Sequence, residues 1–273
     1  MGAFISDHPK ILRQSIRAGQ FLGSTGGLYL GKVQANLVML PVSEALEFLI
    51  FCFRNPKPCP LIEVVEAGSF EPIISAPGAD LRTDIPKYLV YERGTLAAET
   101  TDITSYCDQQ MVSFLLGCSY TFEYALLNAG IPIRHIEQNT IVPMYITSID
   151  TNSTNNLYGP LVVTMRPIPK RQLEKTIKIT SQYPSVHGSP IHVDNFQEIG
   201  IKNLSKPDFG DPVVIKKDEV PVFWACGVTP QIVAQRSKPP LMITHAPGHM
   251  FVTDLDNDKF LIDESILINR LED

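Results

Sequence analysis

The chain has 273 residues, of which 44% are hydrophobic and 19% are charged, and its formal net charge at pH 7 is −6. This composition is typical of a globular protein with a sizeable core and excludes a disordered chain. The negative charge and the lack of a basic run with interleaved aromatic residues argue against nucleic-acid binding. No stretch approaches the roughly 20 apolar residues of a membrane span.

The five cysteines are an odd number without a CxxC spacing, in a chain too long to depend on a disulfide framework. The N-terminus lacks the basic start and the apolar stretch of a signal peptide. We therefore expect a cytoplasmic protein whose partner is a small molecule and which binds neither nucleic acid nor membrane. The sequence leaves a homo-oligomer open.

Predicted strands and helices alternate along the chain. The patterns predict, in chain order, a helix at 9–19, a helix at 43–53, strands at 61–65 and 88–91, a hairpin turn at 92–95, a helix ending near 128, and strands at 133–136, 143–149, 161–165, 177–180, 241–244 and 250–253. This alternation indicates an α/β fold, and the hairpin signals predict mixed sheets.

A short pattern occurs twice in the sequence. Phe114–Glu123 aligns with Val222–Gln231, and the cysteines within them, Cys118 and Cys226, are 108 residues apart. Each copy runs from an apolar stretch through the cysteine to a Thr and then to an acid or amide. This order is typical of a strand that turns into a helix with Thr as its N-cap.

The repeat predicts two intertwined, pseudo-repeated halves within one compact body. The first half would span 1–167 with a β-rich insertion at 61–107, and the second would span 168–273. A chain of this length suits one such body better than two independent domains.

Each cysteine is expected in a turn that leads into a helix N-terminus. Unpaired N–H groups and a partial positive charge there favour a bound carboxylate and lower the pKa of a thiol. Two facing turns would form a small anion site with Cys118 and Cys226 as catalytic candidates. The residues expected to bind substrate at the two helix starts are Ser119, Thr121, Gly227 and Thr229. The alternative is that both cysteines are buried packing residues.

Basic side chains could complete such a site. Arg166 ends an apolar strand and is the first choice for a bidentate clamp on a carboxylate, while Arg82 is flanked by acidic residues that can engage it instead. His187, His245 and His249 lie in short loops and are candidates for general acid–base catalysis, because imidazole titrates near neutrality. The alternative is structural histidines bonded to loop carbonyls.

A metal site is the weaker interpretation of the last loop. His245, His249 and Asp254 are ligand types that suit zinc or manganese. Pro247 and Gly248 separate the histidines, however, so they cannot share a helix face. The spacing matches no strong metal signature. We expect no cofactor, with a divalent metal such as manganese as the alternative.

Several strings spread over nearly the whole chain form a specific combination: Arg54–Pro60, Arg82–Pro86, Gly117–Glu123, Pro184–Gly188, Phe223–Gln231 and Thr244–Met250. Together they resemble the bacterial hydro-lyase family that shares a domain with mitochondrial D-glutamate cyclase. The resemblance implies an α/β body with a smaller α+β portion and a cytoplasmic location. It also implies the reaction that closes D-glutamate to 5-oxo-D-proline with loss of water.

Three functions are open at this point. The first is a hydro-lyase that dehydrates D-glutamate or a related small dicarboxylate. The second is a cofactor-independent amino-acid racemase or epimerase, in which Cys118 and Cys226 act on opposite sides of the substrate Cα. The third is a non-catalytic protein that binds a small dicarboxylate at the same helix N-termini.

Overall fold

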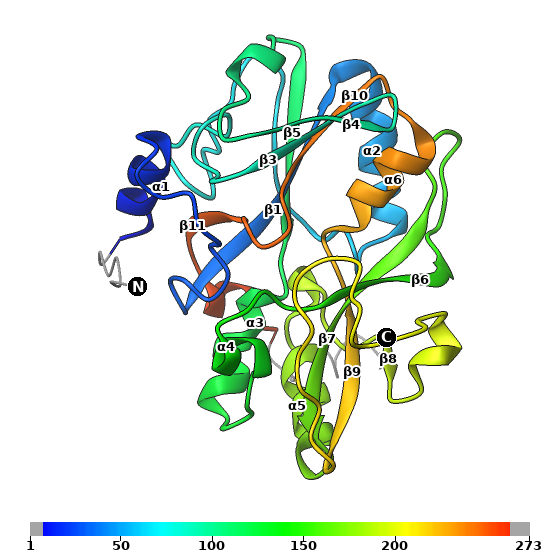
Figure 1. The fold of residues 1–273 in the computed structure, drawn as a ribbon. Helices are drawn as coiled ribbons and strands as arrows, with labels where there is room; N and C mark the ends of the chain where they lie inside the picture. The colour runs from blue at the N-terminus through cyan, green and yellow to red at the C-terminus, as the bar shows by residue number, and fades with distance from the viewer. Residues whose placement is uncertain (1–7, 263–273) are drawn as a thin grey trace, which may run out of the picture.

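Two antiparallel sheets form the centre of the protein, which the computed structural model describes over residues 8–262 (Figure 1). The larger sheet contains β1 (Lys32–Pro41), β2 (Leu61–Val65), β3 (Tyr88–Glu92), β4 (Thr95–Thr100), β5 (Met111–Gly117), β10 (Leu241–His245) and β11 (Phe251–Asp256). Its strands run in the order β2-β5-β1-β10-β3-β4, and β11 also pairs with β1. The strand β1 is therefore the central element of this sheet.

The smaller sheet lies below the larger one in Figure 1 and has four strands. They are β6 (Met144–Asp150), β7 (Pro160–Pro169), β8 (His192–Val193) and β9 (Glu219–Ala225). Their order is β6-β7-β9-β8, so β7 and β9 form its centre.

Six α-helices accompany the sheets within residues 8–262. They are α1 (Pro9–Arg17), α2 (Val42–Arg54), α3 (Tyr120–Asn128), α4 (Arg134–Gln138), α5 (Leu173–Ser181) and α6 (Thr229–Ser237). The helices α2 and α6 contribute Phe48 and Val233 to the core on one face of the larger sheet. The helix α3 contributes Phe122 to the core that packs on Trp224 of the smaller sheet.

The central strand β1 is buried on both faces because apolar clusters flank it. Val38 and Leu40 belong to the cluster under α2 and α6, whereas Leu37 and Met39 belong to a cluster on the opposite face. Successive strand residues point to opposite faces, so a strand covered on both sides needs a continuous apolar run. The polar Asn36 interrupts that run.

Several local predictions are confirmed. The strand β2 has the predicted bounds, and β3 and β4 form the predicted hairpin, in which Glu92 pairs with Thr95. Arg93 and Gly94 both have positive φ, at 47° and 82°. A two-residue hairpin loop of the I′ type needs this conformation at both positions, because its twist then matches that of the strands.

Two predicted strands are helices instead. Residues 133–136 lie at the start of α4, and residues 177–180 lie within α5. Thr176 and Thr180 of α5 are both buried, which is the four-residue spacing of one helix face. Short apolar runs do not distinguish a strand from a buried helical turn by periodicity alone, which explains both errors.

The expected mixed sheets are wrong, because every strand pairing among the described residues is antiparallel. The expected pseudo-repeat of whole halves is not seen either. The two cysteine motifs leave strands of different sheets, with seven and four strands. The similarity is confined to a strand, a turn and a helix. The boundary expected at residue 167 falls within β7, and the division into halves stays a prediction.

No helix within residues 8–262 is both long and apolar enough to cross a membrane.

Candidate functional site

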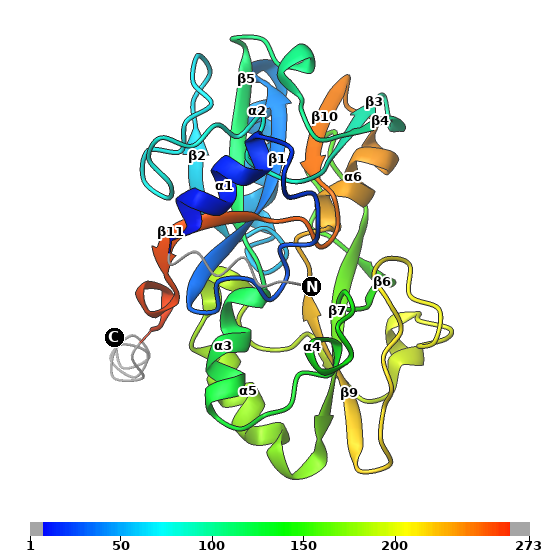
Figure 2. The ribbon, with the colours of Figure 1, turned by 60° about the vertical axis from the view of Figure 1, so that its left-hand side comes forward.

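The two cysteine turns meet where the chain passes between the sheets (Figures 1 and 2). The strand β5 runs through Cys118 into α3, β9 runs through Cys226 into α6, and both cysteines belong to one buried apolar cluster. The Cys226 sulfur accepts a hydrogen bond from the Val228 backbone N–H at 3.5 Å, and the Cys118 sulfur accepts one from Tyr120. Each sulfur thus binds a backbone amide of the turn that starts its own helix.

Asn36 of β1 lies between the two turns. Its Nδ2 donates to the carbonyl of Gly117 at 2.7 Å, and on the other side it approaches Gly227 so closely that a Cβ there would lie 2.0 Å from Nδ2. Gly117 is similarly crowded, because a Cβ would lie 2.2 Å from the Ser185 carbonyl oxygen. Both glycines are therefore required by close approach rather than by an unusual backbone conformation.

Both thiols are nearly inaccessible, at 6% exposure each. Burial raises the pKa of Cys118 to about 11 and that of Cys226 to about 12, although the backbone amides and Arg166 act in the opposite direction. We expected the helix N-termini to lower these pKa values, but the loss of water outweighs the amides here. Both thiols are protonated at neutral pH, which suits proton donation better than nucleophilic attack.

The predicted threonine N-caps are wrong. The N-cap positions are Ser119 for α3 and Val228 for α6, and neither makes a capping bond through its side chain. Thr121 Oγ1 instead accepts from the backbone N–H of Gln34 at 3.3 Å, and Thr229 Oγ1 accepts from that of Val162 at 3.1 Å. These hydroxyls tie the two helix starts to β1 and β7, so they position the turns.

Arg166 of β7 is fully buried, and side chains of the protein hold its guanidinium. Its Nε donates to Glu123 Oε1 at 2.7 Å, and its Nη2 pairs with the same oxygen. Nη2 also donates to Ser119 Oγ, and Nη1 donates to Thr164 Oγ1, both at 3.1 Å. We predicted a substrate carboxylate on Arg166. In the structure the guanidinium of Arg166 binds the carboxylate of Glu123 instead. A role of Arg166 in binding substrate stays a prediction.

Glu123 lies in the first turn of α3 and is fully buried. Burial alone would raise the pKa of this carboxyl, but His135 and Arg166 hold it below its usual value. His135 Nε2 is 3.3 Å from Oε1. The second carboxylate oxygen, Oε2, is buried and has no hydrogen-bond partner among the described residues. Glu123 is thus ionised and retains an unused acceptor.

His187 lies within range of the charge of Arg166. Its Nδ1 is 2.5 Å from the Lys57 carbonyl oxygen, so Nδ1 carries the proton and Nε2 keeps a lone pair. Burial lowers the pKa of His187 to about 4, with a further contribution from Arg166. Its Nε2 is buried and has no hydrogen-bond partner within residues 8–262. A neutral imidazole with a free acceptor nitrogen therefore lies within electrostatic range of Arg166.

His245 lies beside the part of β1 that pairs with neither β10 nor β11. The strand β10 pairs with residues 38–39 of β1, and β11 pairs with residues 32–35. Between them, the Leu37 backbone N–H donates to His245 Nδ1 at 3.2 Å. Burial lowers the pKa of His245 to about 4, and its Nε2 has no bonded partner in the described chain. The ring takes the place of a backbone ladder bond, and its role in acid–base catalysis stays a prediction.

Three predicted residues are engaged elsewhere. Arg82 donates to both carboxylate oxygens of Asp80, at 2.9 and 2.7 Å. His249 Nδ1 bonds the carbonyl of Pro247 at 2.9 Å. Asp254 accepts two hydrogen bonds from Arg13, at 3.0 and 2.9 Å.

The alternative metal site is therefore not assembled. Because Arg13 holds the Asp254 carboxylate, His245 and His249 have no acidic partner in this loop. In the part of the chain that the structure describes, no group of three or more His, Cys, Asp or Glu side chains is placed to hold a metal ion.

Three residues buried around the cysteine turns were not predicted as site residues: Asn36, Glu123 and His135. Two of them carried a signal. Asn36 is a polar residue within the apolar run of β1, and such a residue needs a hydrogen-bonded reason to be buried. Glu123 and Gln231 occupy equivalent places in the repeated motif, and both are fully buried. His135 carried no signal, because its segment was predicted as a strand.

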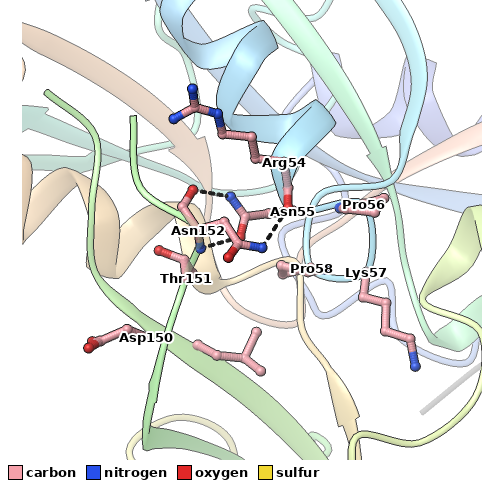
Figure 3. Close-up of a pocket in the computed structure, with 9 residues that line it drawn as sticks. Arg54, Asn55, Pro56, Lys57, Pro58, Asp150, Thr151 and Asn152 are labelled. Carbon is pink, nitrogen blue, oxygen red and sulfur yellow. Dashed lines mark hydrogen bonds between the residues drawn. The ribbon is translucent and has the colours of Figure 1, made fainter. Parts of the chain in front are cut away.

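A surface cavity of about 230 Å³ lies near this group (Figure 3). Its lining includes Asn55 and Lys57 from the loop after α2, Asp150 at the end of β6, and Thr151 and Asn152 from the loop that follows. Asn55 and Asn152 join the two walls, because Asn55 Nδ2 donates to the Asn152 carbonyl at 2.9 Å and Asn55 Oδ1 accepts from the Asn152 N–H at 2.8 Å. The carbonyl of Lys57 also accepts the His187 bond, so the cavity wall contacts the buried group directly.

Comparisons with known proteins confirm the family that the sequence strings indicated. A family described as D-glutamate cyclase matches residues 112–254, which include both cysteine turns and Arg166. The chain is also similar to three proteins named "Putative hydro-lyase". They come from Thermoanaerobacter sp. (strain X514), 58% identical over 92% of this chain and 94% of that protein, Geobacillus kaustophilus, 56% over 92% and 95%, and Stutzerimonas stutzeri, 53% over 92% and 95%.

A solved structure of a nitrogen repressor-like protein from Methanococcus jannaschii superposes with a TM-score of 0.36 at 9% identity, over 89% of this chain and 97% of that one. A superposition this loose supports no inference. The family match covers both cysteine turns, Arg166 and His187. The chain belongs to the hydro-lyases of the D-glutamate cyclase family, which are carbon–oxygen lyases.

Proposed function

We propose that this protein converts D-glutamate, or a closely related small amino dicarboxylate, to its lactam with loss of water. For D-glutamate the product is 5-oxo-D-proline. The observation that carries the proposal is the set of buried residues at the cysteine turns, where the charge of Arg166 acts on His187, whose Nε2 is unpaired among the described residues, and on the two protonated thiols. Membership in the D-glutamate cyclase family supports the choice of reaction.

The reaction requires two protons to move. The substrate ammonium loses two protons as its nitrogen bonds the γ-carboxyl carbon, and one carboxyl oxygen gains two as it leaves as water. No proton enters or leaves overall, so the site needs groups that accept protons from the amine and donate protons to the leaving oxygen. Holding amine and carboxyl together lowers the barrier further, since intramolecular attack in a good geometry is worth roughly 7–11 kcal/mol.

The residues buried around the cysteine turns include proton acceptors and proton donors. His187 Nε2 is an acceptor for an ammonium proton, because its tautomer is fixed by the Lys57 carbonyl. The thiols of Cys118 and Cys226, held protonated by burial, are donors for the departing oxygen. Glu123 Oε2 is a second buried acceptor, which suits a cationic substrate amine. In this scheme the cysteines act as acids and form no thioester.

The cavity beside Lys57 is the proposed approach for the substrate. It shares Lys57 with the His187 hydrogen bond and carries cationic and anionic side chains, among them Arg54 and Asp150. An amino dicarboxylate has both charges and complements such a lining.

The test is proton NMR of the protein with D-glutamate, L-glutamate or 5-oxo-D-proline in D2O. We expect lactam signals from D-glutamate only. The variant His187→Asn should lose at least about 100-fold in rate, the usual contribution of a general base. His192→Asn, a partly exposed histidine five positions along, is the matched control and should keep its rate. No lactam from either enantiomer would overturn D-glutamate as the substrate, and full activity in His187→Asn would overturn the proposed proton acceptor.

A two-thiol racemase is the second candidate, and one observation favours it. Cys118 and Cys226 leave different sheets but share one buried cluster, and the charge of Cys118 affects the pKa of Cys226. The same NMR experiment separates the two reactions, because racemisation exchanges the α-hydrogen for deuterium whereas cyclisation leaves it in place. Cys118→Ser and Cys226→Ser would each abolish racemisation, while Cys107→Ser, outside the cluster, would not.

A further inference from the structure

The helix α2 carries a continuous stripe of exposed apolar side chains. Its members are Val42, Leu46, Leu49, Ile50 and Phe53, with exposures from 39% to 85%. Isolated apolar residues are normal on a protein surface, but a contiguous patch on one helix marks an interaction site. The opposite side of the same helix already packs on the larger sheet through Phe48, so this stripe is a second apolar face.

Four of these residues have the spacing of a helix–helix seam. Val42, Leu46, Leu49 and Phe53 are separated by four, three and four positions, which is the spacing of core residues in paired helices. The stripe carries no charge, although the chain as a whole has a net charge of −6. Pairing through this stripe therefore brings no like charges into the seam.

The spacing of these four residues is the same from either end of the helix. In an antiparallel pair of two α2 helices, Val42 lies opposite Phe53 of the partner copy, and Leu46 lies opposite Leu49. The smallest side chain of the seam then meets the largest at each end, and two leucines meet at the middle. A surface that is complementary to itself about a twofold axis is the requirement for a closed dimer.

We propose that α2 is the interface of a homodimer, in which two copies of this chain pair their α2 helices antiparallel. The exposed area of the five side chains is on the order of 500 Å² per chain, below the roughly 800 Å² that each partner contributes to a standard interface. The dimer is therefore of moderate affinity, in the micromolar range. None of the five residues belongs to the cluster around the two cysteines or to the cavity lining.

The test is sedimentation equilibrium of the full chain from about 1 to 200 μM, a range that brackets a micromolar dissociation constant. We expect a monomer–dimer equilibrium. Leu46→Glu and Phe53→Glu should each weaken it by at least about 100-fold, because a carboxylate would be buried at the seam. Ile73→Glu and Ile74→Glu are matched controls on a loop, at 71% and 69% exposure, and should leave it unchanged. A monomer throughout, or a dimer that survives both α2 variants, would overturn the proposal.

A double-mutant cycle tests the antiparallel direction. Val42→Phe and Phe53→Val each disturb an end of the seam, by overpacking and by a cavity. If the helices are antiparallel, the double variant again places a large side chain opposite a small one at each end of the seam. It then regains the wild-type dissociation constant. If the two effects simply add, the antiparallel pairing is wrong.

Discussion

Arg166 and Glu123 form an ion pair in which both side chains have no solvent exposure. The pair joins β7 of the smaller sheet to the first turn of α3, next to Cys118. Two opposite charges in such a place depend on each other, because either one alone would be a buried charge without compensation. This pair is a structural support of the candidate site as well as a part of its electrostatics.

Loss of one partner should therefore destabilise the fold strongly. Glu123→Gln leaves the guanidinium of Arg166 without its counter-ion, and we expect a loss of about 3–5 kcal/mol in the free energy of unfolding. Urea denaturation followed by circular dichroism measures it. Asp256→Asn, at the exposed ion pair with Lys32, is the control and should change stability far less. Equal effects of the two variants would contradict the structural role of the buried pair.

Gly227→Ala should disrupt the contact between the two cysteine turns. The added Cβ would lie 2.0 Å from Asn36 Nδ2, so either the turn or the asparagine must move. We expect reduced thermal stability, by roughly 1–3 kcal/mol, and a lower turnover rate. Asn36→Ala in the same chain makes room and should recover part of the stability. Gly23→Ala, where the nearest atom would be 3.4 Å away, is the control and should behave as wild type.

The buried thiols should resist alkylation at neutral pH. With a pKa of about 11, roughly one Cys118 side chain in ten thousand is a thiolate at pH 7, so we expect iodoacetamide to react at least about 100-fold more slowly than with a free cysteine. Peptide mapping by mass spectrometry follows each site. An exposed cysteine introduced by Lys206→Cys gives the reference rate in the same chain. Rapid labelling of Cys118 would show that burial does not govern its ionisation.

Stability should fall as the solution is acidified below pH 6.5. The folded-state pKa of His187 and that of His245 are about 4, whereas an unfolded histidine titrates near 6.5, so the unfolded chain binds more protons between these values. Each histidine thus contributes stability that is present above pH 6.5 and lost as the pH falls toward 4. By pH 5 the loss is about 2 kcal/mol for each.

Urea denaturation at pH 7.5 and pH 5.0 measures this dependence. His187→Asn and His245→Asn should each remove part of the difference between the two pH values, and the double variant should remove most of what the pair contributes. Equal stability of the wild type at both pH values would show that these rings are accessible to protons in the folded state.

Local structure that depends on neighbouring residues could be predicted from the amino-acid sequence. The bounds of β2, the hairpin at Arg93 and Gly94, and the two cysteine turns followed from strand patterns and turn chemistry. The family could be predicted as well, because specific strings extend over most of the chain. Arg82 was correctly suspected of bonding its acidic neighbours, since Asp80 is two residues away.

Which polar groups meet, and how burial changes their pKa values, depends on contacts between distant segments. Strand direction depends on pairing between distant segments, so the antiparallel sheets could not be read from the alternation of elements. Arg166 acquired Glu123 as its partner, and the thiols acquired raised rather than lowered pKa values, because desolvation depends on every segment that covers a group. Local sequence spacing predicted the turns, whereas long-range packing determined the hydrogen-bond partners and pKa values of their side chains.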